Sequence, residues 1–194
     1  RISKKDAYDK AVKMLEMVGI SSAEKRMHQY PHEFSGGMRQ RVMIAMSIIC
    51  EPSLIIADEP TTALDVTIQA QILDILKDLK EKMNTSVILI THDLGIVADL
   101  CSRINVMYGG IIVEEGSAED IFYNSKHPYT WGLLRSVPNP KSKVKEKLKP
   151  IDGQPPDLLK PPLGCPFAPR CDYTMKVCLN NQPPLLQVGT GHKS

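Results

Sequence analysis

Apolar residues follow two kinds of pattern along the chain: short unbroken runs typical of buried strands, and the spacing of helices. The run at 54–57 predicts a fully buried strand, and the run at 87–90 predicts a second strand. Two further runs, 103–108 and 111–115, are joined by Gly109-Gly110 and predict a hairpin. The chain is therefore expected to contain both a strand pair and a hairpin.

Elsewhere the apolar residues recur every three or four positions, as on one face of a helix. The predicted helices span residues 3–18, 36–50, 66–83, 94–100 and 117–123. Met46 and Val66 are among the residues expected on the buried sides, and residues 20–33 are expected to form a polar connector. A strand, a helix and a strand in this order predict a parallel pair with a right-handed crossover, so the fold class is α/β.

Two adjacent carboxylates, Asp58 and Glu59, follow the first predicted strand. Acids at the tip of a buried strand are costly unless the protein uses them. Mg²⁺ prefers a few carboxylate oxygens together with substrate phosphates, so Asp58 is a candidate magnesium ligand. Glu59 is then a candidate to polarise an attacking water. A strand that simply ends in a polar turn remains the alternative for this pair taken alone.

Two other sites carry possible phosphate chemistry. Ser35 is a good N-cap, and Gly36 and Gly37 then open a helix whose bare N–H groups and dipole favour an anion. His92 follows the second predicted strand, where it could contact a terminal phosphate and the attacking water. The alternatives are a flexible turn without a ligand and a structural histidine.

Composition narrows the function classes. The 194 residues carry a net charge of +2, which does not argue for nucleic-acid binding. No apolar run approaches the roughly 18 residues of a membrane span, and the first residues lack an apolar signal-peptide core. The expectation is a soluble protein, or one docked on a membrane by other subunits.

The last third of the chain differs from the rest. Most of the 15 prolines lie at or after Pro138, and lysines alternate over residues 141–149, which predicts a solvated linker within a loop-rich region. Cys165, Cys171 and Cys178 are separated by five and six residues, which fits zinc poorly. Iron–sulfur clusters take four thiolates at variable spacing, so a metal centre and three free thiols both stay open. Cys50 and Cys101 are expected to be buried packing residues.

Four motifs in order carry a resemblance: Ser-Gly-Gly-Met-Arg-Gln at 35–40, Leu-Ile-Ile-Ala-Asp-Glu-Pro at 54–60, Ala-Leu-Asp at 63–65 and Thr-His at 91–92. They resemble the signature motif, Walker B strand, D-loop and switch histidine of the ABC transporter ATPases. Residues 30–79 and the proline–cysteine tail are similar to the nucleotide-binding subunit of the oligopeptide/dipeptide importers.

The resemblance implies a partial P-loop NTPase (RecA-like) ABC ATPase core with a helical subdomain remnant and a loop-rich C-terminal extension. The implied segments are a helical subdomain with the signature at 1–50, the catalytic core part at 51–124 and the extension at 125–194. ATP and Mg²⁺ are the implied cofactors. The implied activity is ATP hydrolysis that powers the import of oligopeptides or dipeptides.

The resemblance also assigns roles. Glu59 would be the catalytic base, Asp58 the Mg²⁺ partner, and His92 the sensor of the γ-phosphate. Asp65 would lie across a dimer interface. The implied nucleotide-binding residues, which contact ATP held by the opposite subunit or lie beside it, are Ser35, Gly36, Gly37, Gln40, Asp58 and Asp65.

In the importer family the cysteine set is associated with a [4Fe–4S] cluster. Cys165, Cys171 and Cys178 would then be ligands, with a fourth cysteine beyond Ser194 or His192 in its place. The implied partners are a second ATPase subunit, identical or different, transmembrane permease subunits and an extracytoplasmic peptide-binding protein, with no nucleic acid. The implied location is peripheral, on the cytoplasmic face of the cell membrane.

No Gly-x-x-x-x-Gly-Lys-Ser/Thr loop occurs in the sequence. In the family this loop would lie before Arg1, so the chain is expected to be the C-terminal part of a subunit and inactive by itself. The strand that precedes the loop would lie between 87–90 and 103–108, which predicts a gap in the sheet. The alternatives are a non-catalytic half-ATPase, an iron–sulfur binding module, and an importer of nickel or another solute.

Overall fold

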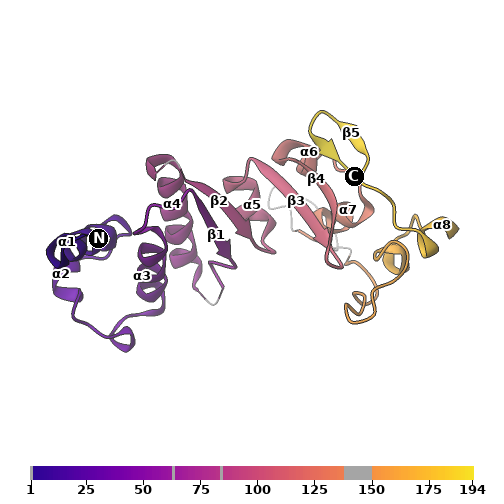
Figure 1. Cartoon of the computed structure of the whole chain (residues 1–194). Helices are drawn as coiled ribbons and strands as arrows, with labels where there is room; N and C mark the ends of the chain where they lie inside the picture. The colour runs from indigo at the N-terminus through magenta and orange to yellow at the C-terminus, as the bar shows by residue number, and fades with distance from the viewer. Residues whose placement is uncertain (1, 63, 84, 138–149) are drawn as a thin grey trace, which may run out of the picture. The chain divides into compact units, whose positions relative to one another are not determined.

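The computed structural model describes residues 2–62, 64–83, 85–137 and 150–194. The chain forms two compact units, Arg1–Asp93 and Leu94–Ser194 (Figure 1). The division falls inside the segment 51–124 that the sequence predicted as one piece of catalytic core. The lysine-rich linker predicted at 141–149 lies outside the described residues.

The first unit begins with helices. Helix α1 (Lys4–Met17) starts after Ser3, whose Oγ accepts the N–H of Asp6 at 3.1 Å. Helix α3 (Gly36–Ile48) starts after Ser35 as predicted. Between them, α2 (Ala23–Arg26) and the 3₁₀ helix η1 (Pro31–Glu33) occupy the segment predicted to be a connector. The segment is mostly exposed as predicted, and local bonds, such as the one from the Tyr30 N–H to Glu33 Oε2 at 2.5 Å, close single turns in it that no apolar pattern announced.

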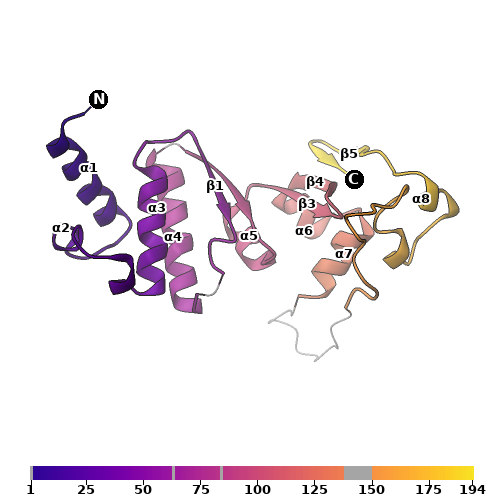
Figure 2. The ribbon, with the colours of Figure 1, turned by 60° about the horizontal axis from the view of Figure 1, so that its bottom comes forward.

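The sheet of the first unit is the predicted parallel pair. Strand β1 (Leu54–Asp58) pairs with β2 (Ser86–Ile90), and α4 (Val66–Met83) connects them. Helices α3 and α4 lie side by side next to β1 (Figure 2). Strand β1 was predicted to be fully buried, but only one face of the pair is covered. The other face carries apolar side chains that are 46–64% exposed, namely Leu54, Ile56, Ile88 and Ile90.

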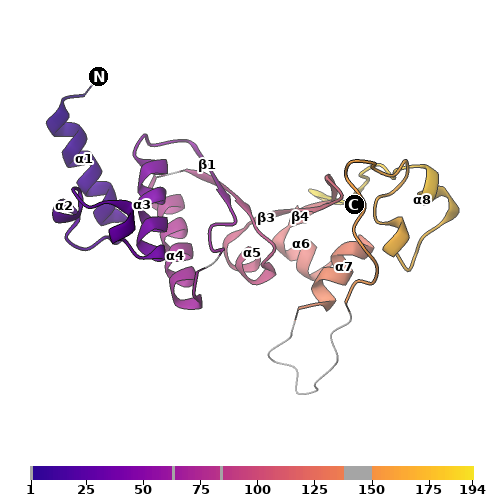
Figure 3. The same ribbon diagram turned by 90° about the horizontal axis from the view of Figure 1, so that it is seen from below.

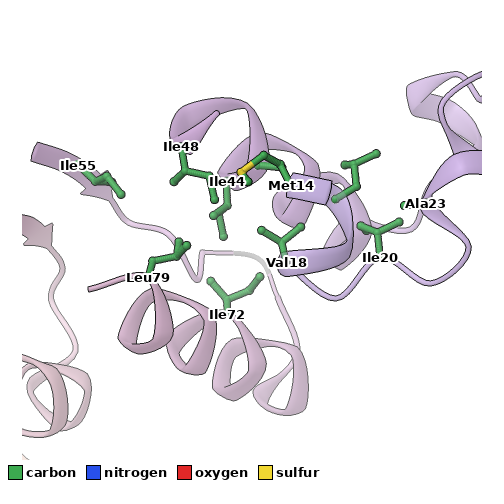
Figure 4. Close-up of a cluster of buried hydrophobic side chains, with 11 residues drawn as sticks. Met14, Val18, Ile20, Ala23, Ile44, Ile48, Ile55, Ile72 and Leu79 are labelled. Atoms are coloured by element: carbon green, nitrogen blue, oxygen red, sulfur yellow. The ribbon is translucent and has the colours of Figure 1, made fainter. Parts of the chain in front are cut away.

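Side chains from α1, α3, α4 and β1 meet in the core of this unit (Figure 4). Val18, Ile48 and Ile72 are fully buried there, and Leu79 is nearly so. The exact helix faces differ from the prediction, because Met46 and Val66 are 70% and 81% exposed. The predicted Ala45, Leu76 and Leu79 are buried, and the buried sides also include Ile44 and Ile48 in α3 and Ile72 in α4.

The second unit contains α5 (Leu94–Leu100) and the predicted hairpin of β3 (Arg103–Tyr108) and β4 (Ile111–Ser117). The hairpin turns at Gly109 and Gly110, which have φ of +59° and +82°. Helix α6 (Ala118–Tyr123) starts with the Ser117–Asp120 capping box. Helix α7 (Pro128–Arg135) was not predicted; with α6 it lies along one side of the β3–β4 pair (Figure 3).

The tail takes part in the second unit. Strands β5 (Gln187–Gly189) and β6 (His192–Lys193) extend the hairpin into a sheet of order β3-β4-β6-β5. Short helices η2 (Ala168–Arg170) and α8 (Lys176–Asn180) interrupt its loops. Phe167 is 3% exposed and packs with residues of β3 and β4 in the core. Strands β2 and β3, predicted to flank a missing strand, belong to separate sheets. Among the described residues, no helix has the length and apolar character needed to cross a bilayer.

The first core gives a stability prediction. Ile72→Ala should lower the free energy of unfolding of the first unit by about 2–5 kcal/mol, because it leaves a cavity where the side chain is fully buried. Urea unfolding followed by far-UV circular dichroism would measure it. Met46→Ala, at an exposed position of α3, is the control and should change little. Equal effects of both changes would contradict the assigned core.

Candidate functional site

The two predicted carboxylates lie where β1 ends. The strands are parallel and in register, with Asp58 opposite Ile90, so Glu59 and the residues after Ile90 emerge at the same edge of the sheet. The backbone N–H of Glu59 donates to the Ile90 carbonyl at 2.9 Å and extends the strand pairing by one bond. This bond places Glu59 beside the segment that carries His92.

Glu59 has an unusual backbone conformation. Its φ of +46° lies in the left-handed region, which is costly for a residue other than glycine. Besides the bond to Ile90, the Glu59 carbonyl accepts the N–H of Thr62 at 3.1 Å. Such conformations persist where the surroundings hold them, and they concentrate at functional sites.

The side chain of Glu59 has a partner on each oxygen. Oε1 lies 2.8 Å from Nδ1 of His92, and Oε2 accepts the hydroxyl of Thr62 at 3.1 Å. The structure thus brings together the two residues predicted to be catalytic. Thr62 was missed by the sequence reasoning; the available signal was a hydroxyl residue three positions after Glu59, across a turn that starts with proline.

The pair changes the acidity of both groups. The hydrogen bond from His92 lowers the pKa of Glu59 below its ordinary 4.5, although burial partly opposes this. The same bond raises the pKa of His92 above its ordinary 6.5. The His92 side chain is 86% exposed, so salt will screen the attraction.

Asp58 and the start of α3 remain open to ligands. The Asp58 side chain is exposed and has no hydrogen-bond partner among the residues that the structure describes. Ser35 Oγ accepts the N–H of Met38 at 3.4 Å and caps α3. A Cβ added to Gly36 would meet nothing within 4 Å, so its backbone is accessible. These features fit a cation at Asp58 and an anion at the N-terminus of α3.

Three other residues of the predicted nucleotide set have roles inside the chain. Gly37 is buried, and a Cβ there would lie 2.7 Å from Cγ2 of Ile68. Gln40 donates through Nε2 to the carbonyl of Pro60 at 3.0 Å. Asp65, predicted to lie across a dimer interface, accepts the N–H of Ile68 on Oδ1 at 3.0 Å and so caps α4.

The cysteines do not converge on a metal site. Cys165 and Cys171 pack against the core of the second unit, and the Cys165 N–H donates to the Cys178 carbonyl at 2.8 Å. Over the described parts of the chain, no three metal-ligating side chains gather into one group. Of the two alternatives that the sequence left open, the described residues therefore give no support to the iron–sulfur cluster and show the three thiols as free cysteines. Cys50 is exposed and Cys101 half-buried because each follows the end of its helix, so the prediction that both are buried was wrong.

His192, considered as a substitute cluster ligand, has a different partner. Its Nε2 lies 2.9 Å from Oε1 of Glu114, and both side chains are almost completely buried. Glu114 also accepts the N–H groups of Lys126 at 2.6 Å and of His127 at 3.2 Å, just before α7. A buried carboxylate requires such partners, so His192 is committed to holding Glu114 and β6 in place.

Comparison with known proteins identifies the family. The family model described as "ABC transporter" matches residues 2–62, and the one described as "Oligopeptide/dipeptide transporter, C-terminal region" matches residues 113–178. The oligopeptide transport ATP-binding protein OppD of Bacillus subtilis (strain 168) is 57% identical over 192 residues, which is 99% of this chain and 54% of that protein. The chain belongs to the ABC transporter ATP-binding family.

Further members of this ABC family agree. OppD of Salmonella typhimurium is 56% identical over 184 residues, covering 95% of this chain and 54% of that protein. The dipeptide transport ATP-binding protein DppD of Bacillus subtilis is 58% identical over 178 residues, covering 92% and 53%. The chain therefore spans about half the length of the curated relatives it matches. The family resemblance read from the motifs is confirmed.

Solved ABC cassettes share the fold. CbiO1 from Clostridium perfringens, part of the ABC transporter complex cbiONQ, superimposes with a TM-score of 0.56 at 27% identity, covering 63% of this chain and 47% of that one. The dimeric ABC transporter cassette MJ0796 gives 0.53 at 30% identity, covering 61% and 50%. The predicted fold class, a partial P-loop NTPase of the ABC type, is confirmed.

The Glu59–His92 pair gives a pH prediction. The stabilisation from His92 is present below pH 6.5 and is lost as the pH rises through its raised pKa. The stabilisation from Glu59 is present above pH 4.5 and is lost as the pH falls through the lowered pKa of Glu59. NMR titration of the His92 ring should give a pKa above 6.5 that Glu59→Gln moves back towards 6.5. The control Glu81→Gln, at an exposed position of α4, should leave the pKa of His92 unchanged. If Glu59→Gln also leaves the pKa of His92 unchanged, the pair does not exist in solution.

The buried pair of Glu114 and His192 in the second unit gives a stability prediction. His192→Ala removes a hydrogen bond to a buried carboxylate and should lower the free energy of unfolding by about 1.5–3 kcal/mol. Urea unfolding followed by the fluorescence of the single tryptophan, Trp131, reports on this unit. Lys193→Ala, which removes a half-exposed ion pair with Glu115, should cost below about 1 kcal/mol. A loss no larger than this control would show that His192 does not hold Glu114.

Proposed function

We propose that the chain is the signature- and Walker B-bearing part of an ATP-binding and ATP-hydrolysing subunit, and that this subunit powers the import of oligopeptides or dipeptides. The relatives named oligopeptide and dipeptide transport ATP-binding proteins support this over nearly the whole chain. The match of residues 113–178 to the transporter C-terminal region supports the peptide branch in particular.

One observation carries the hydrolytic part of the proposal. Glu59 stands at the carboxyl end of a parallel strand, in a left-handed conformation, with His92 on one carboxylate oxygen and Thr62 on the other. A glutamate that merely ended a strand in a polar turn would need neither the strained backbone nor two side-chain partners. The geometry supports a carboxylate held in one orientation for chemistry.

Glu59 would act as the general base. Its carboxylate is ionised near neutral pH, where the hydrogen bond from His92 lowers its pKa further, so it can orient an attacking water and accept its proton. His92 would keep the carboxylate in place and, being largely exposed, could also reach the terminal phosphate. Thr62 would fix the second oxygen and so limit rotation of the carboxylate.

The cofactors are ATP and Mg²⁺, and the residues present fit them. Asp58 would hold the metal ion through its free carboxylate, directly or through water. When bound, Mg²⁺ neutralises charge on the phosphates during transfer. The N-terminus of α3, at Ser35, Gly36 and Gly37, would bind the γ-phosphate of ATP held by an opposite subunit.

The partners follow from the same family. A second ATPase subunit, identical or different, would complete the nucleotide site, and the dimeric structure of the cassette MJ0796 supports such pairing. Permease subunits in the membrane and an extracytoplasmic peptide-binding protein would complete the importer. The subunit would lie peripherally on the cytoplasmic face of the membrane, and its net charge of +2 gives no reason to add a nucleic acid.

The test removes the base. In the assembled transporter, Glu59→Gln should keep ATP binding and lower the rate of hydrolysis by about 10²- to 10⁴-fold, because the amide cannot accept the proton. Phosphate release at saturating ATP and nucleotide binding would be measured in parallel. Glu81→Gln makes the same chemical change at an exposed position and should hydrolyse ATP at the parent rate. Near-normal turnover of Glu59→Gln would remove Glu59 from this role.

A further inference from the structure

The turn that follows Glu59 is held from two sides by glutamine side chains. The turn comprises Glu59–Thr62, Leu64 and Asp65 among the described residues and connects β1 to α4. From α4, Gln69 Nε2 lies within hydrogen-bond distance of two carbonyls of the turn, at 3.2 Å from Thr61 and 3.3 Å from Leu64. Thr61 is only 5% exposed, so these bonds satisfy carbonyls that water reaches poorly.

The second glutamine comes from the signature helix. Gln40 lies on α3, one turn beyond the glycines proposed to bind the γ-phosphate, and donates through Nε2 to the Pro60 carbonyl at 3.0 Å. Pro60 is buried and directly follows Glu59. Proline has no N–H, so its carbonyl is its single backbone hydrogen-bonding group. The orientation of the peptide after Pro60 therefore depends on the amide of Gln40.

The start of α3 is itself fixed against α4. Gly37 approaches Ile68 so closely that a Cβ would lie 2.7 Å from Cγ2. Further along, Arg41 Nη2 donates to Gln71 Oε1 at 2.8 Å and ties the same two helices together away from the turn. A displacement of the start of α3 is therefore passed to the turn through a short path of direct contacts.

We propose that Gln40 is a positioning residue that couples the phosphate-facing start of α3 to the catalytic carboxylate of Glu59 through the carbonyl of Pro60. The inference rests on the proposed function and deepens it. It reassigns Gln40 from the nucleotide contact that its motif implied to a contact within the subunit. The strained backbone of Glu59 must be held by its neighbours, and Pro60 is the nearest neighbour on its carboxyl side.

The structural part of the proposal can be tested without nucleotide. The N–H groups of Thr62 and Leu64 donate to the carbonyls of Glu59 and Thr61, so their hydrogen exchange reports on the turn. In the full chain, Gln40→Leu should speed their exchange about five- to tenfold, as expected for one lost hydrogen bond. Gln71→Leu breaks the other tie between α3 and α4 and should leave both amides as in the parent. Equal exchange in the parent and in Gln40→Leu would overturn the proposal.

Gln40→Glu tests whether the effect of Gln40→Leu comes from the lost hydrogen bond or from a change in packing. The carboxylate has the length of the amide but no donor at neutral pH, so it should speed exchange like Gln40→Leu. Below the pKa of the introduced carboxyl group, its O–H can donate again, and exchange should return towards the parent value. Exchange that is unchanged by Gln40→Glu at neutral pH would assign the effect of leucine to packing and would overturn the proposal.

The functional part uses the assembled transporter. Gln40→Leu should lower kcat for ATP hydrolysis about tenfold with little change in KM for ATP, because Glu59 is misplaced while the nucleotide contacts stay. Gln71→Leu should keep the parent kcat. A parent kcat in Gln40→Leu, or a change confined to KM, would overturn the coupling. If Glu59→Gln hydrolyses ATP normally, the proposed function fails instead, and the exchange experiment still decides whether Gln40 holds the turn.

Discussion

The bond from the backbone N–H of Glu59 to the carbonyl of Ile90 is the constraint on which the candidate site depends. It continues the pairing of β1 and β2 for one residue beyond the regular strands, while the chain is already turning. The turn requires the left-handed conformation of Glu59, and that conformation aims the carboxylate at His92 and Thr62. The chemistry of the site is thus fixed by backbone pairing first and by side chains second.

The second unit has its own organising interaction, around the carboxylate of Glu114. That group lies on the central strand β4, where it accepts hydrogen bonds from two backbone N–H groups before α7 and pairs with the ring of His192 from β6. Gly116 leaves room for this ring, since a Cβ there would lie 3.2 Å from the ring carbon Cδ2 of His192. One buried acid therefore joins a hairpin, a helix and the chain's last strand, which explains how a proline-rich tail acquires a defined structure.

Most of the first unit could be predicted because its signals are local. Ser3 and Ser35 cap helices where expected, and the apolar runs at 54–57 and 87–90 became the parallel pair. The meeting of Glu59 and His92 followed from the rule that parallel strands end at one edge. Thr62, Gln40 and Gln69 could not be assigned in this way, because amides and hydroxyls bond to whichever carbonyl the tertiary structure brings near. In the tail, the family resemblance made the cysteines candidate cluster ligands, with His192 as a substitute, whereas burial beside Glu114 and in the second core decides where they lie.

Gly37 shows how one position can be restricted for two unrelated reasons. Its bare backbone suits an anion at the start of α3, and its missing side chain lets α3 lie against Ile68. A variant that relieved one requirement, such as a smaller residue at 68, would still face the other. Gly36 differs, because a Cβ there would meet nothing within 4 Å and the fold alone would accept alanine. The two adjacent glycines thus separate what the fold demands from what an anion at the proposed site would demand.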